Sequence, residues 1–482
     1  MKEFESFLVA VDDVVWGLPT IILILATGII LTVRCRGIQF TKLRYAFKAI
    51  FKKQDNKGQG ELSGFAALCT ALSATIGTGN IVGVATAIAA GGPGALFWMW
   101  IAAILGTATK YAECMLAIKY REINPADGHI LGGPFYTIEK GMGQKWKWLA
   151  VTFAVFGALA GLMGIGTMSQ INGITSAINN VFDPNNQNIA FTFSGNSYSW
   201  ATVIGSIFVT LCVAFVIIGG IKRIAKVASV VVPFMAALYV FIGLSVIVMN
   251  LTKIPDAFVL IIQNAFGFTA VAGGACGFVL KQITDSMQKG IARGIFSNEA
   301  GLGSAPIAAS AVQTDEPVEQ GLVNMTGTVI DTLIICTMTG LAIVIGGADL
   351  WTSEALGGKG LMGVALTSAA FARNLGGDGH SLQFFLMLCL MFFAFTTILG
   401  WDYYCEKCLE YLTKGKMGPV LVFRWLFIMA VAIGPFFTVN AVFTIADIFN
   451  GLMAIPNCVS LIVLSGVAAK CTKDFFDRHP EI

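Results

Sequence analysis

Charged residues are scarce in this sequence. Only 12% of its 482 residues are Asp, Glu, Lys or Arg, whereas 56% are hydrophobic. Soluble globular proteins carry about 25% charged residues. The scarcity excludes an ordinary soluble fold, because too few charges remain to cover a water-facing surface. The net charge of +3 is also too small to indicate a nucleic-acid partner.

Clustered metal ligands and catalytic groups are scarce as well. The three histidines, His129, His380 and His479, lie far apart in the sequence. The CxxC pair Cys405 and Cys408 has no further ligands nearby, although a structural zinc site usually needs four. No HExxH motif or Ser/His/Asp arrangement occurs within the apolar segments. We therefore expect no cofactor and no enzymatic activity.

Long apolar segments, in contrast, are abundant. A helix needs about 20 apolar residues to cross a bilayer. The candidate spans are Val14–Thr32, Gly64–Ala90, Leu96–Ile118, Leu149–Val181, Trp200–Gly220, Val227–Leu251, Phe258–Leu280, Gly321–Gly346, Leu382–Tyr404, Pro419–Val439 and Val442–Val467. They predict an all-α polytopic protein of the cell membrane with about 11 transmembrane helices. The acidic residues Glu3 and Glu5 favour a retained first span over a cleaved leader.

Basic residues are unevenly distributed between the connecting segments. The stretch from Arg34 to Lys57 is rich in Lys and Arg, and alternate loops continue this enrichment to the C-terminus. The opposite loops contain few basic residues, namely Lys2, Lys253, Lys359 and Arg373. Cytoplasmic loops of membrane proteins are enriched in Lys and Arg. We therefore predict an outside N-terminus and a cytoplasmic C-terminus.

Ten spans remain after the first, and they divide into two groups of five. Because five is odd, the second group enters the membrane from the opposite side, which is the topology of an inverted repeat. We expect an N-terminal helix with a basic cytoplasmic segment at 1–62, a first repeat at 63–251, a second repeat at 252–470 and a cytoplasmic tail at 471–482.

Glycines interrupt the first helix of each group. They are Gly77, Gly79 and Gly83 in the first group, and Gly267, Gly273, Gly274 and Gly277 in the second. An interior glycine costs about 1 kcal/mol relative to alanine. Small-residue packing faces of intact helices are one explanation. Paired interruptions in corresponding helices favour the other, a binding site near the middle of the membrane.

A broken helix at Ala74–Gly83 would suit a zwitterion together with a cation. Unwound backbone offers N–H groups to a carboxylate and carbonyl oxygens to Na⁺ or an ammonium group. We expect substrate contacts from Thr75, Gly77, Thr78, Gly79 and Asn80, and Na⁺ contacts from Ser73, Ala74 and Ile76. In the second group we expect substrate contacts from Phe268, Ala272, Gly273, Gly274, Cys276 and Gly277. This second set would leave room only for a small, uncharged side chain.

The segment Gly91–Glu113, GGPGALFWMWIAAILGTATKYAE, closely resembles the signature of the alanine or glycine:cation symporter family. The runs at Gly132–Met142, Ala292–Pro306 and Asp331–Leu341 also resemble that family, in the expected order. The resemblance implies a LeuT-type fold of two inverted five-helix repeats, here with one extra N-terminal helix. It also implies uptake of alanine or glycine coupled to Na⁺, or in some members to H⁺.

Polar side chains within the spans are further candidates. In LeuT-like folds an adjacent hydroxyl pair on the corresponding helix binds sodium, which implies this role for Thr396 and Thr397. The alternative is that each hydroxyl bonds its own helix backbone. Gln170 either faces the substrate or bonds a neighbouring helix, and Asn172 is a weaker candidate.

Acidic residues in the spans have different expected roles. Asp331 is a candidate coupling residue, because an intramembrane carboxylate is usually functional. Glu113 and Lys110 are expected to anchor a helix near the interface. Asn298 and Glu299 are expected in a cytoplasmic segment, as part of a gate or a helix cap.

The sequence therefore predicts a secondary active symporter that couples Na⁺ influx to uptake of alanine or glycine by alternating access. Its partners would be the amino acid, Na⁺ and the lipid bilayer. An H⁺-coupled or other small-solute symporter of the same fold is the alternative. A passive channel or facilitator would need a continuous polar pore, whereas the spans are mostly apolar.

Overall fold

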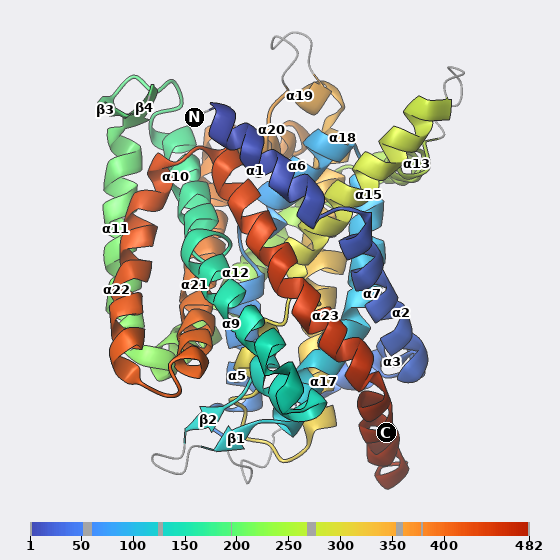
Figure 1. Ribbon diagram of the computed structural model, residues 1–482. Helices are drawn as coiled ribbons and strands as arrows, with labels where there is room; N and C mark the ends of the chain where they lie inside the picture. The colour runs from blue at the N-terminus through green and yellow to red at the C-terminus, as the bar shows by residue number, and fades with distance from the viewer. Residues whose placement is uncertain are drawn as a thin grey trace.

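A computed structural model describes residues 2–51, 60–123, 129–193, 195–267, 276–352, 360–376 and 379–480 (Figure 1). Long helices form a bundle with the N-terminus at one end and the C-terminus at the other (Figure 1). Among the described residues, nine helices are long and apolar enough to cross a membrane. The all-α polytopic fold is thus as predicted. The count of about eleven spans, the repeat boundaries and the sidedness stay predictions.

The first half of the chain contains α1 (Lys2–Val15), α2 (Leu18–Arg34), α3 (Ile38–Thr41), α4 (Leu43–Phe51), α5 (Gly64–Thr75), η1 (Thr78–Asn80), α6 (Val82–Gly91), α7 (Gly94–Lys119), α8 (Pro134–Tyr136), η2 (Thr137–Met142), η3 (Gln144–Trp146), α9 (Lys147–Met163), α10 (Met168–Phe182), α11 (Trp200–Ile217) and α12 (Gly220–Met249). Two antiparallel hairpins connect helices in this half. They are β1 (Glu122–Ile123) with β2 (Ile130–Leu131), and β3 (Ile189–Phe193) with β4 (Asn196–Ser199). The hairpins lie at opposite ends of the bundle (Figure 1).

The second half contains η4 (Leu251–Lys253), α13 (Ile254–Ala265), α15 (Cys276–Asn298), α16 (Ala305–Ala309), α17 (Pro317–Thr328), η5 (Val329–Cys336), α18 (Thr337–Gly346), α19 (Asp349–Thr352), α20 (Gly363–Leu375), α21 (Gly379–Leu412), α22 (Met417–Ile433), η7 (Gly434–Phe436) and α23 (Val439–Arg478). The elements α17, η5 and α18 run on as one helix whose middle, η5, is a π-helix. The extra residue per turn makes this region wider than an α-helix, a feature frequent at functional sites.

Burial separates the central helices from those that face lipid. The most apolar part of α7 is 83% buried, whereas that of α12 is only 28% buried. Large apolar side chains such as Phe215, Phe241 and Trp425 are exposed on α11, α12 and α22. Lipid tails cover such faces in a bilayer. The functional groups are therefore sought around α7 and its neighbours.

The helix predicted to break within Ala74–Gly83 is interrupted there in the structure. Helix α5 ends at Thr75, the short η1 turn follows, and α6 starts at Val82. The extended backbone of Ile76 and Gly77 separates the two halves. The prediction from the glycines is confirmed at this position.

The second interruption lies elsewhere than predicted. Helix α15 runs without a break to Asn298, and α16 starts at Ala305. In the connector, Glu299, Gly301 and Gly303 have φ of 58°, 92° and 82°. A helix cannot continue through such left-handed residues. The described interruption is therefore at 299–304.

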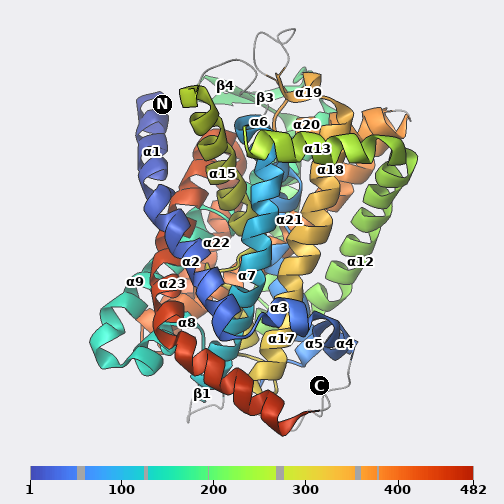
Figure 2. The same cartoon turned by 90° about the vertical axis from the view of Figure 1, so that its right-hand side faces the viewer.

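The predicted span Phe258–Leu280 is wrong as a single helix. Helix α13 ends at Ala265, and Figure 2 shows it lying across the long helices. Its buried residues, Ala257 and Ile261 among them, recur every fourth position on one face. A 12-residue helix is about 18 Å long, too short to span a bilayer. Apolar composition alone could not distinguish such a surface helix from a span.

Candidate binding site at the interrupted helices

Side-chain oxygens, one from η1 itself and one from α10, satisfy the backbone N–H groups freed at the first interruption. The N–H of Gly77 donates to Asn80 Oδ1 at 2.9 Å, and that of Thr78 donates to Gln170 Oε1 at 3.0 Å. A Cβ on Gly77 would lie 2.5 Å from Thr397 Oγ1 and 2.9 Å from Gln170 Oε1. Only glycine fits at this position, so its backbone can be approached closely.

Thr397 brings a hydroxyl to the carbonyl oxygens of the first interruption. Its Oγ1 lies 3.0 Å from Ser73 O, 3.2 Å from Ile76 O and 3.0 Å from Phe393 O. One hydroxyl has a single hydrogen and cannot donate to three carbonyls at once. The oxygens therefore outnumber the available donors. A hard cation such as Na⁺ binds oxygens arranged in this way.

The hydroxyl of Thr396 is bonded mainly within its own helix. Its Oγ1 lies 3.0 Å from the carbonyl oxygens of Phe392 and Phe393, and 3.5 Å from Met235 Sδ. This is the backbone bonding within one helix that was the alternative to sodium binding. The shared carbonyl of Phe393 still places Thr396 beside the oxygen cluster at Thr397.

Three further predicted residues serve mainly to pack and cap α5. Thr75 Oγ1 donates to Ala71 O at 2.7 Å, so this hydroxyl is used within its own helix. Ser73 Oγ likewise donates to Thr70 O at 2.7 Å. Ala74 packs tightly on α21, since a Cβ on Gly400 would lie 2.7 Å from the Ala74 Cβ.

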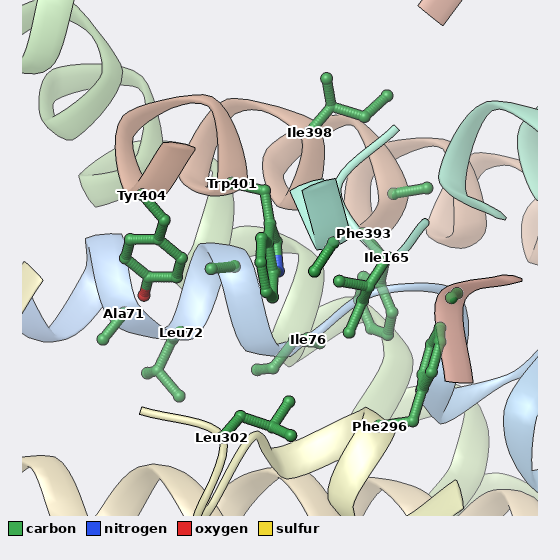
Figure 3. Packing of buried hydrophobic residues seen from close by; sticks show 14 of the residues in the cluster. Ala71, Leu72, Ile76, Ile165, Phe296, Leu302, Phe393, Ile398, Trp401 and Tyr404 are labelled. Carbon is green, nitrogen blue, oxygen red and sulfur yellow. The ribbon is translucent and has the colours of Figure 1, made fainter. Parts of the chain in front are cut away.

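Apolar side chains surround the oxygen cluster. Figure 3 shows Trp401 and Phe393 reaching from α21 toward the segment of Ile76, with Leu302 and Phe296 on its other side. All five of these residues are at most 2% exposed. Charge–dipole interactions are stronger in such a dry environment than in water.

Asp331 lies directly against the first interruption. Asn80 Nδ2 donates to Asp331 Oδ1 at 2.6 Å, and the hydroxyls of Ser297 and Thr332 donate to Asp331 Oδ2 at 2.8 and 2.7 Å. Asp331 is fully buried within the π-helical turn Val329–Cys336. All three of these partners are neutral. The candidate coupling residue is thus joined through Asn80 to the backbone of the site.

The two candidate amides on α10 have different neighbours. Gln170 Nε2 donates to Ile165 O at 2.8 Å, while its Oε1 accepts from the N–H of Thr78. Gln170 therefore contacts the site and also bonds a neighbouring turn. Asn172 donates to Phe437 O at 3.0 Å and lines the cavity described next.

A cavity of about 550 Å³ adjoins this region through Gly173, which packs on Thr78. It is also lined by Val9 of α1, the helix at the end of the bundle that carries the N-terminus (Figure 1). Helices α6, α10, α15, α20 and α23 contribute its walls. Representative lining residues are Val82, Gly173, Arg293, Gly363 and Phe443. Arg293 forms an ion pair with Asp447 at 2.8 Å, which joins α15 to α23 at the wall.

The opposite end of the bundle is closed. The N–H of Glu61 donates to Ala311 O, and that of Gln313 donates to Leu62 O, both at 2.8 Å. The guanidinium of Arg121 adds bonds to three carbonyls of the same segment. Its acceptors are Ser310, Val312 and Thr314, at 2.8, 2.6 and 2.5 Å. The segment before α5 is thereby held to the segment after α16.

The residues predicted at the second break do not meet the first one in the described structure. Phe268, Ala272, Gly273 and Gly274 lie outside the described residues. Cys276 and Gly277 open α15, whereas Ser297, near its other end, packs on Gly79. Twenty residues of helix separate Gly277 from Ser297, a distance of about 30 Å. Cys276 and Gly277 therefore lie far from the first interruption along α15, and their predicted contact with the substrate stays a prediction.

The polar residues at the second interruption are buried within the protein. Glu299 is fully buried, and its carboxylate accepts from Trp401 Nε1 and from Ser304 Oγ, both at 2.7 Å. Asn298 is also fully buried. Both residues therefore lie inside the protein, and the predicted cytoplasmic side of this segment stays a prediction. The glycines at 301 and 303, next to a carboxylate, were the signal that could have indicated a second break.

Lys110 and Glu113 are buried beside that interruption. Each is 2% exposed. Lys110 Nζ donates to Asn298 O at 2.9 Å, and Glu113 Oε2 accepts from Asn457 Nδ2 at 3.0 Å. They are anchored inside the bundle, where α15 and α17 pack on α7, and their predicted position near the interface stays a prediction.

Comparisons with known proteins agree on the family and fold. The family model for the sodium:alanine symporter family matches residues 1–481. Sodium/alanine symporter AgcS of Methanococcus maripaludis is 44% identical over 98% of this chain and 97% of its own length. An uncharacterized transporter of Haemophilus influenzae is 50% identical, over 98% and 96%. The probable sodium/glutamine symporter GlnT of Bacillus subtilis is 36% identical, over 98% and 91%.

A solved structure is similar as well. The crystal structure of MhsT in complex with L-phenylalanine superposes with a TM-score of 0.54, covering 86% of this chain and 98% of that chain. At 13% sequence identity, the similarity concerns the fold alone. It confirms the predicted LeuT-type fold.

Proposed function

This chain belongs to the sodium:alanine symporter family, and on that premise we propose that it couples Na⁺ influx to uptake of alanine or glycine. Membership in this family makes it a multi-pass membrane transporter. The cation, the cargo and the direction of transport are the parts that we propose.

The oxygen cluster around Thr397 carries the proposal for Na⁺. A hydroxyl with three carbonyls in reach leaves acceptor oxygens unmatched by donors. These oxygens come from the end of α5, at Ser73 and Ile76, and from Phe393 of α21. Na⁺ bound among them would tie α5 to α21. Thr396 would complete the set by turning its hydroxyl from Phe392 toward the ion.

The cargo would bind on the other side of the first interruption. The buried hydroxyl of Thr78 has no partner among the described residues. The neighbouring N–H of Thr78 and the side chain of Gln170 are the groups that a carboxylate would meet first. Ser297 and Phe296 pack within contact distance of Gly79, which limits the space for a side chain. These features support a small amino acid such as alanine or glycine.

Asp331 is the group that we propose for coupling. It accepts hydrogen bonds from Asn80 of the first interruption and from Ser297 at the end of α15, so it is bonded to both interrupted helices. Its neutral partners leave its charge available to a second cation or a proton. If Asp331 takes up a proton during transport, the uptake would be coupled to H⁺, which is the alternative to coupling by Na⁺ alone.

A bundle that is open at one end and closed at the other favours an alternating-access mechanism and argues against a channel. The cavity adjoins the site through Gly173, which packs on Thr78, while Arg121 and the paired segments hold the other end together. We propose that the open end faces the outside, since the basic loops predict that the C-terminal end is cytoplasmic. Transport would then require the Arg121 contacts to break while the cavity collapses.

Uptake of radiolabelled alanine into proteoliposomes tests the function. We expect accumulation with an inward Na⁺ gradient and no accumulation when choline replaces Na⁺ at fixed pH. A potential of 100 mV would support about 50-fold accumulation per Na⁺. Equal uptake in Na⁺ and choline would refute Na⁺ coupling. Competition by unlabelled glycine and glutamine, the cargo in the name of the relative GlnT, would define the cargo.

A further inference from the structure

A basic pocket lies far from the transport site, at the end of the bundle that carries the C-terminus. It has a volume of about 190 Å³ and forms where α2 turns into α3 against the last turns of α23. Figure 1 shows α2 and α3 beside this part of α23. The residues that matter are Arg34, Arg36, Lys42, Lys473, Phe476 and Asp477.

Positive charge dominates this pocket. Four basic side chains face one acidic side chain, which gives a formal charge of +3. The side chains of Arg34, Arg36 and Lys473 form no hydrogen bond or ion pair with any residue that the structure describes. Lys42 Nζ lies 4.6 Å from the centre of the Phe476 ring. The side chains of Arg34, Arg36 and Lys473, held close together in this way, attract an anion.

The backbone fixes the position of these charges. Arg36 and Gly37 both have left-handed backbone, with φ of 56° and 64°, and they turn the chain sharply between α2 and α3. A non-glycine residue with such a φ is uncommon. Cys35 and Ile38, on either side of the turn, are at most 2% exposed. The basic side chains therefore project from an anchored turn and not from a loose loop.

Apolar surface adjoins the basic pocket. Val33 is 73% exposed and Phe40 is 67% exposed. On α2, Ile22 and Ile29 continue the same apolar exposure at 61% and 51%. A ligand in the pocket would thus have an anionic group among the bases and a hydrocarbon part along α2. This combination is the chemistry of a phospholipid.

We propose that this pocket binds the headgroup phosphate of an anionic phospholipid. Arg34, Arg36 and Lys473 surround the phosphate, and Val33 and Phe40 contact the acyl chains. Pockets of basic residues between helices on the cytoplasmic side are suited to anionic headgroups. The bound lipid links α2 and α3 to α23, near the two ends of the chain. This site is independent of the cargo site.

Binding of fluorescent phosphatidylglycerol to the full-length purified protein tests the proposal, with phosphatidylcholine as the zwitterionic comparison. The test variant combines Arg34→Gln, Arg36→Gln and Lys473→Gln. The matched control combines Arg44→Gln, Lys48→Gln and Lys145→Gln, which removes the same charge from basic residues that do not line the pocket. We expect the test variant to bind phosphatidylglycerol about 10-fold more weakly, and the control less than about 2-fold more weakly.

Inorganic phosphate and glycerol 3-phosphate distinguish a lipid from a free phosphate. We expect neither to displace the fluorescent lipid, because neither has acyl chains. Displacement by these ions would show that the pocket takes free phosphate, which overturns the lipid assignment. An equal loss of phosphatidylglycerol affinity in the control variant would show that only the total charge of the protein matters, which would refute the proposed site. If the triple variant does not fold, Arg36→Gln alone provides the measurement, and unchanged lipid affinity in it overturns the proposal.

Discussion

The two interrupted helices of this protein differ in how their polar groups are satisfied. At the first, between α5 and α6, the local residues are small and uncharged, and Gly77 leaves room for Thr397 and Gln170 to approach the backbone. At the second, between α15 and α16, Glu299 is bonded to Trp401 and Ser304. The first interruption keeps unmatched oxygens, whereas the second is neutralised by the protein itself.

This difference indicates that the first interruption offers groups to a ligand, whereas the second has a structural role. Backbone groups freed inside a membrane must find partners. At the second interruption Lys110 is one such partner, donating to Asn298 O. At the first interruption an excess of carbonyls around Thr397 remains for a ligand. Variants that affect stability at one site and transport at the other would test this division.

Lys110→Met should have the largest effect, on stability. Lys110 donates to Asn298 O and is the buried cation whose charge acts on the nearby carboxylates of Glu113 and Glu299, so its removal leaves those buried charges without a compensating cation. Leaving buried charge uncompensated costs about 3–5 kcal/mol. Thermal denaturation of the detergent-purified protein measures the loss. Lys119→Met, at the exposed end of α7, is the control and should denature like the parent protein.

Gly77→Ala should nearly abolish transport while the protein still folds. The added methyl would collide with Thr397 Oγ1 at 2.5 Å and Gln170 Oε1 at 2.9 Å. We expect about a 100-fold fall in the initial rate of alanine uptake, since overpacking costs about 1–3 kcal/mol. Gly83→Ala is the matched control, because its methyl would meet nothing closer than 3.9 Å. Equal losses in both variants would contradict the special role of Gly77.

Thr397→Ala should raise the Na⁺ concentration for half-maximal uptake about 10-fold, which corresponds to about 1.4 kcal/mol. The reason is the loss of the hydroxyl that meets the carbonyls of Ser73 and Ile76. Thr397→Ser keeps the oxygen and should restore most of the affinity. Thr396→Ala should have a smaller effect, since that hydroxyl bonds its own helix. Unchanged Na⁺ dependence in the Thr396→Ala, Thr397→Ala double variant would refute the ion site.

Ser304→Ala should have the smallest effect and only on stability. It removes one donor to Glu299, a hydrogen bond of 2.7 Å. A hydrogen bond to a charged group contributes about 1.5–3 kcal/mol, but the bond from Trp401 remains to hold the carboxylate. We expect a lower denaturation temperature with Na⁺ affinity unchanged. A shift in Na⁺ affinity instead would mean that the second interruption also contributes to the ion site.

Sequence reasoning identified the first interruption but not the second. Glycines within an apolar span marked the break around Gly77, because interior glycines are costly in an intact helix. The same reasoning chose the glycine-rich segment before α15 as the second break. The break after α15 contains only Gly301 and Gly303 beside a carboxylate, and Glu299 made the segment look cytoplasmic.

The sequence by itself determined the environment and the position of the first broken helix. Apolar segment length and the scarcity of charge require a bilayer, and interior glycines require an irregular backbone. Only the tertiary structure decided which polar groups meet. Thr397 and Ser73 are separated by more than 300 residues, and their contact depends on how α21 packs on α5. Likewise, the burial of Lys110 follows from helices that cover α7 on several sides, which no local pattern records.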